Sequence, residues 1–124
     1  MKKFKRIDPQ AVPEICRKRK IVPVRGVYVG ASGRRCAACA VGIHLIDAVG
    51  KKAALAIMRA WQELELAGGY DPNYIEGLSN GWEGCVLNYC WRLNIAHSPD
   101  RFRAGHRDGK AAWKACVNAG LVSP

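Results

Sequence analysis

The chain has 124 residues, of which 49% are apolar and 24% are charged, and it carries a formal net charge of +10. This length and composition are typical of one globular domain with a core of its own, and they exclude a wholly disordered chain. No apolar run approaches the roughly 18 residues of a membrane-spanning helix. We therefore predict a single domain with no membrane span.

The first six residues are strongly basic, like the start of a signal peptide, but no apolar stretch follows them. Asp8, Pro9 and Gln10 come next instead. The sequence therefore predicts no export signal and a cytoplasmic location. In that compartment thiols stay reduced, so we expect the cysteines to serve as small buried apolar residues. They are Cys16, Cys36, Cys39, Cys85, Cys90 and Cys116.

Positive charge is concentrated near the N-terminus. Residues 1–35 hold eleven of the 20 basic side chains and two of the 10 acidic ones, a net charge of +9, whereas the remaining residues carry +1. Clustered lysines and arginines bind phosphate backbones by releasing counterions. We interpret residues 1–20 as a basic N-terminal arm that precedes a single helical domain over residues 21–124.

The arm begins with a helix-start signal, because Asp8 is a good N-cap and proline suits the next position. Pro13 limits this helix to a turn or two unless a helix restarts there. Residues 21–36 then predict a small β-hairpin or ribbon, with β-branched residues up to 29, a turn over 30–33 and a return strand over 34–36. Pro23 places the first strand at a sheet edge. The alternative is one strand, a loop and a helix starting near Cys36.

About four helices follow, according to apolar periodicity and the start and stop signals. We expect them over residues 38–49, 52–67, 72–94 and 99–118. The last two begin with matching signals, Asp71-Pro72 and Ser98-Pro99, each an N-cap followed by proline. The predicted fold is mainly α, with the helices packed as two antiparallel pairs beside the ribbon.

The last two predicted helices share a spacing pattern displaced by 28 residues. In each, glycines follow an aromatic residue at helical spacing: Tyr74-x-x-Gly77-x-x-Asn80-Gly81 and Phe102-x-x-Gly105-x-x-Asp108-Gly109. A glycine inside a helix costs about 1 kcal/mol relative to alanine. We therefore predict that a set of glycines allows two helix backbones to approach closely: Gly77, Gly81, Gly84, Gly105 and Gly109. The alternative is a glycine-lined groove for a flat ligand.

Cys36 and Cys39 form a CxxC pair, which permits two kinds of thiol chemistry. A redox site needs a thiolate at a helix start on a βαβ scaffold, and the rest of the chain predicts no such scaffold. A structural zinc site needs four ligands, so the pair would be joined by Cys85 and Cys90 or by His97 and His106. On a continuous helix Cys85 and Cys90 point about 140° apart, which opposes the first of these sets.

The strongest candidate site is the basic segment. Its predicted contact residues are Arg17, Lys18, Arg19, Lys20, Arg25, Arg34 and Arg35. We predict a non-enzymatic binding or interaction module without a cofactor, whose partner is nucleic acid. The alternatives for this segment are a solvated tail, an acidic protein partner or an anionic membrane surface.

Two other functions stay open. One is a thiol-redox or zinc-binding protein centred on Cys36 and Cys39. The other is a small enzyme with a site assembled from scattered residues, for which His44 and Asp47 offer an acid–base pair without an accompanying nucleophile. The oligomeric state is also open, a homodimer included.

Overall fold

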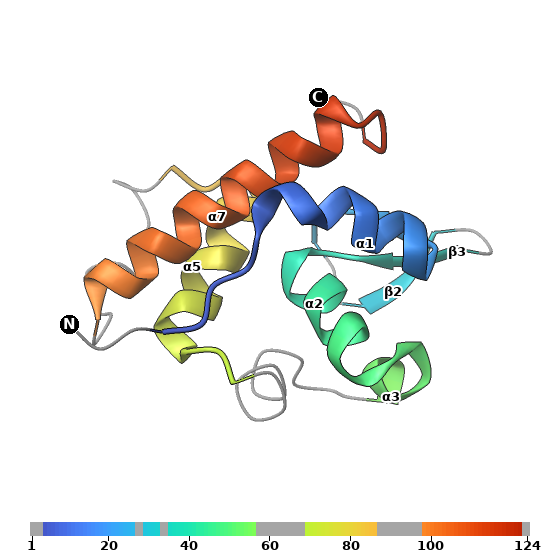
Figure 1. Ribbon diagram of the computed structural model, residues 1–124, viewed down its shortest axis with the longest axis horizontal. Coiled ribbons are helices and arrows are strands. Elements are labelled where there is room, and N and C mark those ends of the chain that lie inside the picture. The colour runs from blue at the N-terminus through green and yellow to red at the C-terminus, as the bar shows by residue number, and fades with distance from the viewer. Residues whose placement is uncertain (1–3, 27–28, 33–34, 57–68, 87–97, 123–124) are drawn as a thin grey trace.

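The computed structural model describes residues 4–26, 29–32, 35–56, 69–86 and 98–122. These residues form a mainly α-helical fold, which confirms the predicted fold class. Figure 1 shows two neighbouring groups of elements: the helices α5 (Pro72–Trp82) and α7 (Pro99–Asn118), and a second group built around a small sheet.

The N-terminal segment lies on this helical core (Figure 1). Ile7 is buried, and a short 3-10 turn, Pro9–Ala11, leads into α1 (Val12–Arg19). Asp8 caps the turn by accepting a hydrogen bond from the amide of Gln10 at 3.1 Å. The helix restarts around Pro13, which stands in the first turn of α1, where its missing N–H leaves no bond unmade.

The sheet has three strands in the order β1-β3-β2: β1 (Ile21–Pro23), β2 (Val29–Ser32) and β3 (Arg35–Ala38). The β2 and β3 strands form an antiparallel hairpin, but its first strand occupies Val29–Ser32, where the turn over 30–33 was predicted. The β1 strand instead pairs parallel with β3 on the opposite edge, with Ile21 beside Cys36. The amide of Val24 continues this ladder by donating to the Ala38 carbonyl at 2.9 Å, so residues 21–36 are not one continuous ribbon.

Two helices follow the sheet, α2 (Ala40–Val49) and α3 (Lys51–Ala56). Gly50 separates them with a φ of +87°, as its predicted stop role requires. The α2 helix is the centre of the core, because its residues 40–46 are all buried. The remainder of the helix predicted over 52–67 lies outside the described residues.

The third predicted helix ends earlier than expected, at Trp82 instead of residue 94. Gly84 adopts a φ of +83°, and its amide donates to the Gly81 carbonyl at 3.2 Å. The amide of Cys85 donates to the Asn80 carbonyl at 3.0 Å. These two bonds form a Schellman motif, which terminates a helix at a left-handed glycine. Gly84 is therefore a helix cap and not a packing glycine.

The helices α5 and α7 run parallel, in contrast to the expected antiparallel pairs. Their first turns lie together, since the Ser98 amide donates to the side-chain oxygen of Asn73 at 3.3 Å and Arg101 pairs with Asp71. Trp82 and Trp113, farther along the two helices, have ring centroids 5.0 Å apart. The start of α7 therefore lies beside the start of α5 and not beside its end.

Four glycines bring these parallel backbones into contact. A Cβ atom at Gly77 would clash with the carbonyl of Phe102, and one at Gly105 would clash with the carbonyl of Tyr74. Gly81 meets the His106 carbonyl and Gly109 meets the Leu78 carbonyl in the same manner. Each contact maps onto another by the displacement of 28 residues, so the sequence repeat corresponds to a local pseudo-twofold axis between α5 and α7.

Candidate functional site

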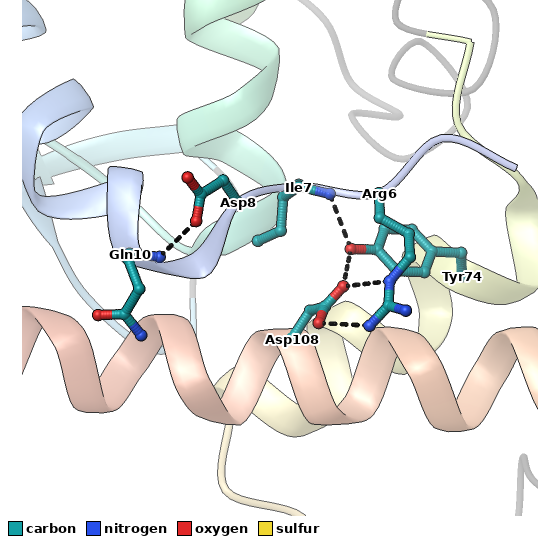
Figure 2. Close-up of polar contacts among 6 residues, drawn as sticks. All are labelled: Arg6, Ile7, Asp8, Gln10, Tyr74 and Asp108. Carbon is teal, nitrogen blue, oxygen red and sulfur yellow. Dashed lines mark hydrogen bonds and ion pairs between the residues drawn. The ribbon is translucent and has the colours of Figure 1, made fainter.

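The N-terminal segment is attached to α5 and α7 by a partly buried polar network (Figure 2). Arg6 donates to both carboxylate oxygens of Asp108, at 3.0 and 2.8 Å. The Tyr74 hydroxyl donates to the same carboxylate at 2.5 Å and accepts from the Ile7 amide at 2.9 Å. Asp108 is only 5% exposed, and the Arg6 guanidinium compensates its negative charge.

The network favours fixed protonation states. Burial, together with the hydrogen bond to Asp108, raises the pKa of Tyr74 above its ordinary value, and the bond to Asp108 raises the pKa of Arg6. At neutral pH the phenol therefore stays protonated and the guanidinium stays charged. This arrangement stabilises the docked segment.

Two further cations of the basic segment are used within the fold. Arg19 pairs with Asp47 at 3.2 Å. The Arg25 Nε atom donates to the Trp82 carbonyl at 2.7 Å, and its guanidinium lies 4.1 Å from the centroid of the Trp113 ring. Part of the positive charge near the N-terminus thus serves to hold the molecule together.

The structure separates Arg25 from the predicted contact residues at the end of α1. Arg17 and Lys18 are exposed on α1, and Lys20 follows the end of that helix. Arg17 and Lys20 line one cavity, whereas Arg25 lines a different one. Arg34 and the side chain of Arg35 lie outside the described residues.

Sequence reasoning missed a second row of cations, on the outer face of α7. Arg103, Arg107, Lys110 and Lys114 are all exposed and follow one another at i, i+4, i+7 and i+11, which places them on one helix face. Arg103 lies 3.4 Å from Asp100. In the described part of the chain, no carboxylate lies within ion-pair distance of the other three.

A cavity of about 620 Å³ lies beside this row. Arg25, Arg107, Lys110 and Lys114 line it together with Trp113, and no carboxylate is among its lining residues. Val86 adds an exposed apolar side chain at the edge, at 59% of its full exposure. A positively charged groove with an apolar margin results.

The second cysteine of the CxxC pair, Cys39, lacks the properties of a reactive thiol. Cys36 lies in β3, and Cys39 is the N-cap residue of α2. Burial raises the pKa of Cys39 to about 11, which outweighs the lowering expected at a helix start. The thiol of Cys39 is therefore protonated at neutral pH.

The remaining cysteines do not form a zinc site among the residues that the structure describes. Cys16 and Cys116 are buried free thiols, and Cys85 is disulfide-bonded, so the prediction of reduced thiols is wrong at Cys85. A disulfide sulfur cannot serve as the thiolate ligand that the first zinc set requires. Among the described residues no three metal-ligating side chains cluster, and Cys90 and His97 lie outside them.

The proposed acid–base pair does not form. His44 is buried, and its Nε2 atom has no hydrogen-bond partner in the described part of the chain. Burial lowers the pKa of His44 to about 4, whereas Asp47 is exposed and pairs with Arg19. His44 is thus a neutral core residue.

No helix within the described ranges combines the length and apolar character needed to cross a bilayer. Comparison with protein-family models, curated proteins and solved structures finds no match to this chain.

Proposed function

We propose that the protein is a non-enzymatic module that binds nucleic acid through its phosphates, with the outer face of α7 as the main contact surface. The carrying observation is the row of exposed cations on α7, three of which have no ion-pair partner among the described residues. This proposal keeps the predicted ligand class and assigns the contact to a different element.

Ion pairing within the fold supports this assignment. Three carboxylates of the helical domain form ion pairs with arginines: Asp108 with Arg6, Asp47 with Arg19 and Asp71 with Arg101. A count of charge along the sequence makes residues 36–124 nearly neutral, at +1, and Asp108 is one of the carboxylates in that sum. In the folded chain Arg6 already compensates that carboxylate, and among the described residues Arg107, Lys110 and Lys114 have no ion-pair partner that competes with an external polyanion.

The geometry of the row suits a phosphate backbone. At 1.5 Å per residue, Arg107 and Lys114 are separated by about 10 Å along a helix that α5 supports from the other side. Duplex DNA carries one negative charge per roughly 1.7 Å of axis, so several phosphates lie within reach. With about four phosphates neutralised, the log–log salt slope should be about −3.6.

The test compares two variants that each lose three positive charges. The first changes Arg107, Lys110 and Lys114 to glutamine, and the second changes Arg17, Lys18 and Lys20 to glutamine. Each is titrated with labelled duplex and single-stranded DNA and RNA at several salt concentrations. We expect the α7 variant to lose most of its affinity and to show a shallower salt slope, while the α1 variant keeps the parent slope.

Three outcomes would contradict the proposal: no binding by the parent at low salt, equal binding by the parent and the α7 variant, or a larger loss in the α1 variant. The last would return the interface to the N-terminal segment. Circular dichroism of both variants checks that the helices are intact. Cytoplasmic location and oligomeric state stay predictions.

A further inference from the structure

A second cavity, of about 500 Å³, lies at the junction of α1, β1, β3 and α3. It shares no lining residue with the groove beside α7. Arg17, Lys20 and Lys51 line it, and no carboxylate does. Its volume falls within the range of small-molecule sites.

Lys20 has an unusual backbone conformation for its residue type. It follows the last residue of α1 with φ 56° and ψ 53°, and it is the only non-glycine residue with positive φ in the described ranges. The α5 and α7 helices place glycine at the corresponding point, Gly84 and Gly120, where the left-handed conformation carries no steric penalty. Helix termination alone would favour glycine here too, so the lysine side chain needs another explanation.

The three cations come from two segments, the end of α1 and the start of α3. Arg17 stands in the last turn of α1, where a cation is favoured by the helix dipole in any case. Lys51 begins α3, and its Nζ atom donates to the carbonyl of Lys20 at 3.3 Å. This bond holds Lys51 against the strained residue. The convergence of Lys20 and Lys51 is not accounted for by the dipole of α1.

Apolar side chains also line the cavity, those of Ile21, Val22 and Leu121. A ligand that fits both kinds of side chain has an anionic head and an apolar body. Phosphate monoesters match best, because their head is dianionic near neutral pH and accepts several charge-assisted hydrogen bonds.

We propose that this cavity binds a small organic phosphate, with the phosphate held by Arg17, Lys20 and Lys51 and the organic group packed on Ile21, Val22 and Leu121. The free thiol of Cys36 also lines the cavity and provides a reporter of occupancy. The ligand is distinct from the nucleic acid proposed for α7, and the two sites are testable separately.

The probe is naphthyl phosphate, measured by calorimetry with the full chain at constant ionic strength. Naphthol removes the charge and inorganic phosphate removes the apolar body. We expect naphthyl phosphate to bind at least tenfold more tightly than either, and to slow the alkylation of Cys36 by iodoacetamide. Absence of binding, or equal affinity for inorganic phosphate, would overturn the proposal, the latter by indicating unspecific attraction of anions.

The decisive variant is Lys20→Gly. It removes one cation and relieves the left-handed conformation, so the thermal midpoint should rise by a few degrees while the affinity for naphthyl phosphate falls about tenfold. Lys18→Gln is the matched control, because Lys18 is exposed on the same helix and does not line the cavity. An unchanged affinity in Lys20→Gly, or an equal loss in Lys18→Gln, would refute the site.

Discussion

Gly77 of α5 lies directly against the backbone carbonyl of Phe102 of α7. The obstacle to a side chain at this position is a peptide group in the opposite helix, which cannot rotate away as a side chain can. Whether a larger side chain fits at Gly77 therefore depends on the distance between the two helix axes.

The first prediction is that Gly77→Ala and Gly105→Ala each destabilise the protein by about 1–3 kcal/mol, as overpacking does. This loss should appear although alanine has the higher helix propensity by about 1 kcal/mol. Because the two positions are related by the pseudo-twofold axis, their losses should be similar. Chemical denaturation measures both, with Ser79→Ala on α5 as the control. A variant more stable than the parent would refute the close contact at that glycine.

The second prediction separates the cap glycine from the packing glycines. Asparagine tolerates the left-handed conformation better than alanine does. At the end of α5, Gly84→Asn should therefore lower the thermal midpoint less than Gly84→Ala does. At Gly81 the order should reverse: Gly81→Ala should be less destabilising than Gly81→Asn, because only side-chain size matters against the His106 carbonyl. Thermal midpoints of the four variants decide the matter. The same order at both positions would show that they have the same role.

The third prediction concerns the docked N-terminal segment. Tyr74→Phe keeps the ring but removes the acceptor of the Ile7 amide and one donor to Asp108, and the loss of buried hydrogen bonds should cost about 1–3 kcal/mol. Hydrogen exchange at the Ile7 amide should accelerate more than exchange within α7. If the Ile7 amide keeps its protection, another group holds the segment.

The fourth prediction is a dependence of stability on pH through His44. Its pKa is about 4 in the folded chain and near 6.5 when exposed, so the unfolded chain takes up a proton first as the pH falls. The stability associated with the neutral ring is complete above pH 6.5 and decreases toward pH 4, by about 3 kcal/mol in all.

The variant His44→Phe should flatten this part of the stability curve, since phenylalanine does not titrate. Lys5 and Asp47 act on His44 from a distance, and Tyr70 packs beside it at 6.3 Å between ring centroids. Lys5→Gln serves as the control, because it changes the surrounding charge and leaves the imidazole in place. A parent curve that is flat between these pH values would contradict the buried neutral state.

The sequence predicted those elements whose ends are marked by local chemistry. The span of α7 agrees with expectation because Pro99 opens it and Gly120 closes it, and α2 ends before Gly50 for the same reason. The end of α5 was missed because apolar periodicity continues past Gly84. A glycine in a sequence does not reveal whether its φ will be negative, as in a helix, or positive, as in a cap.

The cationic face of α7 was hidden for a different reason. The net charge of residues 36–124 is only +1, and that sum counts Asp108 although Arg6, more than one hundred residues away, compensates it. Such pairing depends on the tertiary structure. The helical spacing of Arg107, Lys110 and Lys114 was visible in the sequence, and a count by helix face would have revealed it.

The pseudo-twofold contact between α5 and α7 has one more consequence. Glycines and carbonyls are the same on both sides, so the backbone contact does not distinguish one helix from the other. The residues that do so are Tyr74 and Asp108, whose counterparts 28 residues away are Phe102 and Asn80. Phe102 has no hydroxyl, and the Asn80 side chain bonds its own helix at the Glu76 carbonyl. The Tyr74 hydroxyl, the Asp108 carboxylate and Arg6 thus determine how the otherwise interchangeable helices α5 and α7 are placed relative to the N-terminal segment.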